Sequence, residues 1–240
     1  MNIVITMAGA GTRFRKAGYT VPKYQIEAHS KTLFEWAMLS LEDFRSPDNR
    51  YIFIVRQEDK AEEFISKQCS TMKLDNYAVL QLETGTDGQA TTVMKAIPYC
   101  YIDEPLLIYN IDTFVEPGEM KVSDIVGDGF IPCFKAPGDH WSFVKLGEKG
   151  KVVEVREKER ISENCTLGAY YFNSCSLYTR LYHEYYGQQT QEDTEKYVAP
   201  LYNKLILEGG EVLISIVPYD RVHVLGTPEE LNVFINTYKL

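Results

Sequence analysis

A glycine-rich segment near the amino terminus has the residue types that bind phosphate groups. It directly follows an apolar stretch, Asn2–Met7, and comprises Ala8, Gly9, Ala10, Gly11 and Thr12. Glycines at such a place let backbone N–H groups approach an anion closely. Two cations follow, Arg13 at once and Lys23 directly after a proline. Because a guanidinium fork and an ammonium point charge can together bind a triphosphate, we expect phosphate chemistry here.

The segment differs from two well-known phosphate-binding loops. A dinucleotide-binding loop, G-x-G-x-x-G, would need a third glycine where Phe14 stands, and a P-loop would need a following G-K-[ST] sequence that is missing. A dinucleotide-dependent oxidoreductase is therefore disfavoured.

An aspartate, Asp112, comes at the end of another apolar stretch, just after Leu106–Asn110. A carboxylate in such a place is costly unless it is paired or binds a cation. Carboxylate, water and phosphate oxygens are the usual ligands of Mg²⁺, so we predict that Asp112 binds this ion. The alternative is that Asp112 caps the following turn with support from Thr113.

The elements that must position these residues alternate in the first half of the chain. Apolar runs typical of buried strands are followed by helical patterns, and Thr32–Glu35 has the spacing of a helix capping box. The predicted strands are Asn2–Met7, Tyr51–Arg56, Tyr77–Glu83 and Leu106–Asn110; the predicted helices are Thr32 to about Phe44, a charged helix to about Cys69, and Gly88–Ile97. Such alternation predicts a mainly parallel sheet flanked by helices, with ligands at the carboxyl ends of its strands.

The second half has strands without helices between them, and then helices. The predicted strands are Gly129–Lys135, Trp141–Leu146, Val152–Arg156, Leu167–Phe172 and Val212–Val217; helices are expected near Ser174–Tyr186, at Thr194–Leu207 and after Thr227. We therefore expect one α/β domain over residues 1–240. A Rossmann-like, nucleotide-binding half would cover about 1–115, and a smaller mixed α/β, acceptor-binding half about 116–240.

Charge and cysteine content restrict the class of protein. Among 240 residues, 25 are Lys or Arg and 34 are Asp or Glu, so the net charge is −9 and nucleic acid or an anionic membrane is repelled. The sequence contains no apolar run near the ~20 residues of a membrane span and no secretion signal. The five cysteines lack C-x-x-C spacing, so buried thiols in the cytoplasm are expected.

Several motifs in order resemble the sugar-phosphate nucleotidyltransferase family. G-A-G-T-R-F followed by P-K is similar to that family's G-x-G-[ST]-R-[LF] and P-K. Further matching segments are Gly88-Gln89-Ala90, Tyr109-Asn110-Ile111-Asp112, Glu157-Lys158, Gly168-Ala169-Tyr170-Tyr171-Phe172 and Gly226-Thr227-Pro228-Glu229-Glu230-Leu231. The resemblance implies a GT-A-like nucleotidyltransferase fold.

The resemblance also implies a reaction. A phosphorylated acceptor, a sugar or small polar metabolite, attacks the α-phosphorus of a nucleoside triphosphate and displaces pyrophosphate, with Mg²⁺ as cofactor. Arg13, Lys23 and Asp112 would be catalytic. Lys158 would bind the acceptor's phosphate and Glu157 a hydroxyl or amine, although Arg156–Arg160 has alternating charges typical of a solvated surface.

Three residues of the resemblance concern the binding of the acceptor and the base. Gly168 would allow close approach of the acceptor, with simple strand packing as the alternative. In the segment that reads the base, Glu83 replaces a common glutamine; it can accept but not donate hydrogen bonds. With the backbone of Gly88 beside it, this favours a pyrimidine, with CTP slightly ahead of UTP and dTTP.

A departure from the family concerns the metal. Val224 stands where relatives have a second metal-binding aspartate. We favour a single-carboxylate site at Asp112, with Asp220 as an alternative second ligand, whereas His223 would more readily make a hydrogen bond to the acceptor.

The leading hypothesis is thus a cytoplasmic nucleotidylyltransferase that serves surface (capsule) polysaccharide synthesis. A non-catalytic nucleotide sensor on the same fold is the alternative. The sequence leaves the oligomeric state open, with a homodimer as one option.

Overall fold

The computed structural model describes residues 1–187 and 195–239. The helices are α1 (Thr12–Lys16), α2 (Leu33–Leu39), α3 (Glu62–Met72), α4 (Gln89–Ala96), α5 (Cys175–Tyr186), α6 (Leu201–Leu207) and α7 (Pro228–Thr237). The strands are β1 (Asn2–Thr6), β2 (Glu27–Ala28), β3 (Lys31–Thr32), β4 (Arg50–Arg56), β5 (Tyr77–Leu82), β6 (Leu106–Asn110), β7 (Thr113–Val115), β8 (Gly129–Lys135), β9 (Ser142–Leu146), β10 (Val152–Glu157), β11 (Asn164–Thr166), β12 (Ala169–Phe172), β13 (Val212–Ile216) and β14 (Val222–Val224).

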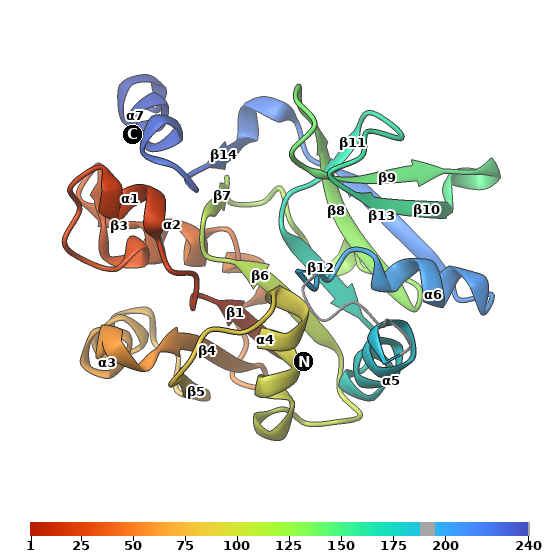
Figure 1. Ribbon diagram of the computed structural model, residues 1–240, viewed down its shortest axis with the longest axis horizontal. Coiled ribbons are helices and arrows are strands. Elements are labelled where there is room, and N and C mark those ends of the chain that lie inside the picture. The colour runs from red at the N-terminus through yellow and green to blue at the C-terminus, as the bar shows by residue number, and fades with distance from the viewer. Residues whose placement is uncertain (188–194, 240) are drawn as a thin grey trace.

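One ten-stranded sheet runs through the molecule (Figure 1). Its order is β10-β9-β11-β8-β12-β6-β1-β4-β5, and β13 pairs with β8. The strands β6, β1, β4 and β5 are parallel, with Asn2 opposite both Leu106 and Arg50. This arrangement confirms the predicted α/β fold with a mainly parallel first half, and it brings the carboxyl ends of β1 and β6 side by side.

The antiparallel part of the sheet begins at β12, which pairs with β6 on one side and β8 on the other. The sheet therefore passes without a break from strands of the first half to strands of the second. Strands β9 and β10 form an antiparallel pair joined at Glu148–Gly150.

Helices cover both faces of the sheet. Since successive side chains of a strand point to opposite faces, those of β1 pack alternately against the two helical layers. Ile3 and Ile5 of β1 pack in one core cluster with residues of α2 and α3. Val4 packs in a second cluster with residues of α4, α5 and α6. All three side chains are fully buried, as expected for a strand between two helical layers.

A third, aromatic cluster joins α7 to α2 and β7. The ring of Trp36 lies 4.7 Å from that of Phe114 and 5.2 Å from that of Phe234. The helix α7 begins as predicted, with the Thr227 hydroxyl accepting from the Glu230 N–H at 3.1 Å. The packing holds α7 against α1, α2 and β7, and Figure 1 shows β14 in the same group of elements.

Some predicted boundaries differ from those of the structure. The helix predicted to reach Phe44 ends at Leu39 and continues as a separate 3₁₀ turn. The helix expected at Thr194–Leu207 begins only at Leu201, after Pro200, and Thr194 lies outside the described residues. Neither α1 nor the short strands β7, β11 and β14 were predicted, because segments this short have too little periodicity to detect.

Among the helices that the structure describes, none is both long and apolar enough to cross a bilayer.

Candidate active site

The glycine-rich loop lies at the carboxyl end of β1 and presents its backbone to a narrow crevice. Gly11 has a φ of +60°, in the left-handed region that favours glycine, and precedes the first turn of α1. No atom lies within 4 Å of where a Cβ would be on Gly9 or Gly11. Both glycines therefore face open space that a ligand can occupy.

A lysine and an aspartate from distant parts of the chain meet beside this loop. The Lys23 ammonium donates to Asp112 Oδ2 at 2.8 Å, and these side chains are 18% and 31% exposed. Burial disfavours the charged carboxylate, but the Lys23 charge and hydrogen bond, a hydrogen bond to the backbone of Asp112 and the Arg13 charge together lower the pKa of Asp112. The structure thus brings together Arg13, Lys23 and Asp112.

The crevice is lined by an arginine that sequence reasoning missed, Arg15, and not by Arg13. Arg15, Lys23, Tyr24 and Asp59 line it together with Gly9–Gly11 and nearby apolar residues. The Tyr24 hydroxyl donates to Asp59 at 3.2 Å, and burial raises the pKa of Asp59. Recognising Thr12–Lys16 as a helical turn would have drawn attention to Arg15.

The loop assigned to base reading lies after β5. Glu83 is exposed there, immediately beyond the last strand residue. Gly88 has a φ of +144°, and a Cβ on it would lie 2.3 Å from the Lys196 carbonyl oxygen. The close approach of the Lys196 backbone therefore requires glycine at this position.

A polar cluster occupies the carboxyl ends of the two central strands. Gln89 at the start of α4 donates to Thr6 at 3.1 Å and to the Asn110 side-chain carbonyl. Gly168, with a φ of +85°, packs on Asn110: an added Cβ would lie 2.7 Å from the Asn110 Nδ2 atom. Gly168 is thus explained by close packing of β6 and β12. Gln89 and Asn110 belong to two of the motifs that resemble the family, but the sequence alone assigned them no place in the site.

In the second half, Glu157 turns inward. The Ser142 hydroxyl of β9 donates to its carboxylate, and a chain of hydroxyls continues through Tyr170 to Thr166. Burial raises the pKa of Glu157 despite the Ser142 hydrogen bond. Glu157 is therefore a half-buried hydrogen-bonding group and does not belong to a solvated face.

Lys158 turns away from Glu157. Its φ is +55°, an uncommon backbone conformation for a residue other than glycine. The ammonium donates to the Tyr197 hydroxyl, lies 4.6 Å from the centre of that ring, and is 3.9 Å from Glu195. The side chain of Lys158 is thus anchored to the segment that begins at Glu195, and it is 54% exposed.

Two solved structures share this architecture at low sequence identity. The inositol-1-phosphate CTP transferase of T. maritima aligns at a TM-score of 0.76 and 15% identity, over 100% of this chain and 97% of the other. A putative glucose-1-phosphate thymidylyltransferase of Bacillus anthracis, solved with sucrose, aligns at 0.77 and 12%, over the same shares of the two chains. At such identities the likeness shows the fold.

A third structure is more similar in sequence. The nucleoside-diphosphate-sugar pyrophosphorylase of Vibrio cholerae RC9 is 34% identical, aligns over 98% of this chain and 100% of the other, and has a TM-score of 0.90. The chain belongs to the sugar-phosphate nucleotidyltransferase family. It is an enzyme of the nucleotidyltransferase class. Family profiles and curated proteins were also compared, and none matches.

The structure of this nucleotidyltransferase separates Asp220 from Asp112. Strands β14 and β7 are antiparallel, with Val224 opposite Thr113 and Val222 opposite Val115. Asp220 precedes Val222 and is exposed at the far end of this ribbon. Over residues 1–187 and 195–239, no group of three or more His, Cys, Asp or Glu residues could hold a metal ion.

His223 does not turn toward the crevice of the nucleotidyltransferase. Its Nε2 lies 3.2 Å from a Glu116 oxygen, and its ring stacks on Phe114 at 5.3 Å. It is thus part of the aromatic cluster of α7.

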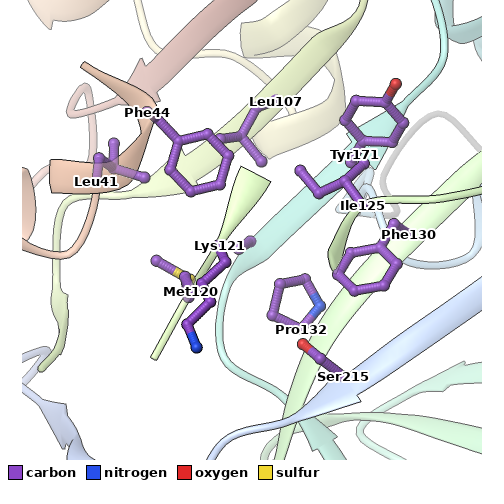
Figure 2. Close-up of a pocket in the computed structure, with 11 residues that line it drawn as sticks. Leu41, Phe44, Leu107, Met120, Lys121, Ile125, Phe130, Pro132, Tyr171 and Ser215 are labelled. Atoms are coloured by element: carbon purple, nitrogen blue, oxygen red, sulfur yellow. The ribbon is translucent and has the colours of Figure 1, made fainter. Parts of the chain in front are cut away.

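Two further hollows of the enzyme lie away from the glycine-rich loop. The hollow in Figure 2 lies at the seam of the two halves, between apolar side chains such as Phe44, Leu107 and Phe130. Its volume is about 10 Å³, room for at most one water, so it is a small packing gap. A larger hollow of about 500 Å³ lies at the amino ends of β4 and β5, opposite the edge that holds the loop, and is lined by residues 45–47, 49, 51 and 72–76.

Proposed function

We propose that this enzyme joins a nucleoside triphosphate to a phosphorylated sugar or small polar metabolite and releases pyrophosphate. The observation that carries the proposal is the contact of Lys23 with Asp112 at 2.8 Å beside the open glycine-rich loop. A cation and a carboxylate in contact beside a glycine-rich backbone loop suit the transfer of a nucleotidyl group.

In this reaction an oxygen of the acceptor's phosphate forms a bond to the α-phosphorus. The bond from that phosphorus to the oxygen leading to the β-phosphorus breaks, and pyrophosphate leaves with the electron pair. The attacking phosphate is already ionised at neutral pH, so no general base is needed. Gly9–Gly11 would orient the triphosphate, while Arg13, Arg15 and Lys23 would neutralise its charge.

Nucleotidyltransferases of this family generally use a divalent metal. The residues present fit such an ion. The carboxylate of Asp112 is held in its charged form, and a Cβ on Gly226 would come within 3.3 Å of Asp112 Oδ2, so glycine keeps that approach open. Asp112 would hold Mg²⁺ together with water and phosphate oxygens; the bound ion would supply charge neutralisation at the phosphates.

We place the acceptor between the two halves, with residues 1–115 binding the nucleotide and 116–240 the acceptor. Glu157 would bind a hydroxyl or amine of the acceptor, and Lys158 would bind its phosphate after leaving Tyr197 and Glu195. Gly168 supports this site by letting β12 pack against Asn110. The relative from Vibrio cholerae is named for nucleoside-diphosphate sugars, which supports a sugar-type acceptor.

For the base we propose a pyrimidine, with CTP ahead of UTP and dTTP. Glu83 is exposed and free to accept a hydrogen bond from the cytosine amine, while the backbone of Gly88 would complete the contact. We further propose a cytoplasmic enzyme of surface polysaccharide synthesis. The five cysteines are all unpaired thiols, as suits a reducing compartment.

The test measures pyrophosphate release with CTP, UTP, dTTP, ATP and GTP, each against a panel of phosphorylated sugars, polyols and amino compounds. We expect release with a pyrimidine nucleotide and release slower by about 10³ from the Asp112→Asn variant. Faster release with ATP or GTP would contradict the base assignment. If no pair reacts but nucleotide binds in equilibrium dialysis, the protein is a sensor.

A further inference from the structure

A carboxylate oxygen of α7 is buried without a partner. Glu230 Oε2 is inaccessible to solvent, and nothing in the described residues makes a hydrogen bond to it. Glu230 also forms no ion pair with the basic groups of these residues. Leaving a charged oxygen unsatisfied is costly, which indicates that a ligand normally meets it.

Helix capping does not use this oxygen. At the start of α2, Glu35 closes a capping box: Glu35 Oε2 accepts from the Thr32 N–H at 2.8 Å, and Glu35 N–H donates to Thr32 Oγ1 at 3.2 Å. At the start of α7, Thr227 accepts from the Glu230 N–H at 3.1 Å, but the return bond to the Glu230 carboxylate is absent. The Glu230 side chain is directed elsewhere.

The space it faces is shared with Asp112. A Cβ on Gly226 would lie 3.3 Å from Asp112 Oδ2 and 3.4 Å from Glu230 Oε2. Two features of the chain produce this approach. The Leu225 N–H donates to the Asp112 carbonyl at 2.7 Å, which fixes Gly226 beside the aspartate. Helical side chains tilt toward the amino end of their helix, which carries the Glu230 carboxylate back over Gly226.

The charges around this space are suited to a cation. Lys23 touches Asp112 at 2.8 Å and thus supplies the positive charge that this carboxylate requires. Glu230 has no such partner among the described residues. A divalent ion there would face two carboxylates, and Mg²⁺ is commonly held by one or two carboxylates with waters and substrate phosphates completing its shell.

We propose that Glu230 is the second carboxylate of the metal site and acts from α7 in place of the aspartate that Val224 replaces. The inference rests on the proposed function for the role of Asp112 as the first carboxylate. Gly226 is part of the site because an added Cβ there would lie within 3.4 Å of an oxygen of each carboxylate.

The test titrates the full-length protein with Mn²⁺, alone and with CTP, and follows free Mn²⁺ by electron paramagnetic resonance. We expect Glu230→Gln to weaken protein-dependent Mn²⁺ binding by at least about tenfold, and Asp112→Asn to weaken it further. The matched control is Glu229→Gln, the exposed neighbour, which should bind as the wild type does. Asp220→Asn should also leave the affinity unchanged.

A second variant removes no charge. Gly226→Ala is conformationally permitted, because its φ lies outside the left-handed region, but its methyl group would lie 3.3 Å from Asp112 Oδ2 and 3.4 Å from Glu230 Oε2. It should weaken Mn²⁺ binding about as much as Glu230→Gln does, with circular dichroism confirming the fold. Wild-type affinity in both variants would overturn the inference, as would a wild-type protein that holds no Mn²⁺ with or without CTP.

The two proposals fail separately. Failure of every nucleotide and acceptor pair to release pyrophosphate would remove the proposed function and leave a Glu230-dependent metal site standing. Release that is lost in Asp112→Asn, together with unchanged Mn²⁺ binding in Glu230→Gln, would keep the function and remove Glu230 from the site.

Discussion

The two halves of the molecule each contribute a lysine and a carboxylate, and the structure treats the two pairs in opposite ways. Lys23 and Asp112 are 89 residues apart in sequence, yet they touch at 2.8 Å. Glu157 and Lys158 are adjacent, yet they separate: Glu157 accepts from Ser142, and Lys158 donates to Tyr197. Adjacency in a motif therefore does not make two side chains partners.

The charge states differ as well. Lys23, the Asp112 backbone and Arg13 together outweigh burial and lower the pKa of Asp112, whereas burial outweighs the Ser142 hydrogen bond and raises the pKa of Glu157. The first carboxylate is kept ionised, as a cation ligand must be. The second is a group that takes up a proton more readily, which suits hydrogen bonding to a polar acceptor.

The largest effect that tests this contrast is on turnover. Asp112→Asn should lower kcat by about 10³ because it removes the charge that holds the cation. Glu157→Gln, which keeps hydrogen-bonding capacity, should lower kcat/KM by roughly tenfold or less, mainly through the KM of the acceptor. Pyrophosphate release under saturating nucleotide measures both. Equal losses in kcat would erase the distinction between the carboxylates.

Of the two lysines, we likewise expect the one in the first half of the chain, Lys23, to matter more for turnover. Lys23→Ala should lower turnover by roughly 10²–10³, the loss expected for one donor to the transition state. Lys158→Ala should act mainly on binding of the acceptor, because its ammonium is exposed and held by Tyr197 and Glu195 in the free enzyme. Initial rates at varied acceptor concentration separate the two. The contrast breaks down if Lys23→Ala retains near-native turnover.

A smaller effect is expected on metal binding without nucleotide, where Lys23→Ala should cause a gain and not a loss. Because the Lys23 ammonium occupies Asp112 in the free enzyme, Lys23→Ala should strengthen Mn²⁺ binding by roughly fivefold. Lys158→Ala should not change it, and it serves as the matched control. Weaker Mn²⁺ binding in Lys23→Ala would mean that the lysine supports the metal site and does not compete for it.

The smallest effect is expected on the pH dependence of the free energy of unfolding. The lowered pKa of Asp112 stabilises the fold above its ordinary value of 3.8, and this contribution is lost as the pH falls below that value. The raised pKa of Glu157 stabilises the fold below the ordinary value of 4.5, and this contribution is lost as the pH rises above it.

Urea unfolding between about pH 3 and pH 7 measures these contributions through the two amide variants. Relative to the wild type, Glu157→Gln should gain free energy of unfolding as the pH rises above 4.5. The deficit of Asp112→Asn should shrink as the pH falls below 3.8. Parallel curves for both variants would refute the opposite directions of the two pKa shifts.

Local sequence determined the elements of this protein. Asn2–Met7 is apolar throughout because it is buried on both faces, and Thr32–Glu35 and Thr227 begin helices because their side chains satisfy backbone N–H groups nearby. The glycine-rich loop was predictable for the same reason: a left-handed φ at Gly11 is a property of one residue. These features depend on interactions between residues within a few positions of one another.

Tertiary structure alone decided which side chains face one another. That Arg15 lines the crevice, that Glu157 turns inward and that Gly88 abuts Lys196 depend on how distant segments pack. The clearest case is the T-x-x-E pattern, which begins both α2 and α7. Glu35 closes its own cap, whereas Glu230 lies beside Gly226, because the hydrogen bond of the Leu225 N–H to the Asp112 carbonyl and the packing of Phe234 on Trp36 fix the start of α7 there.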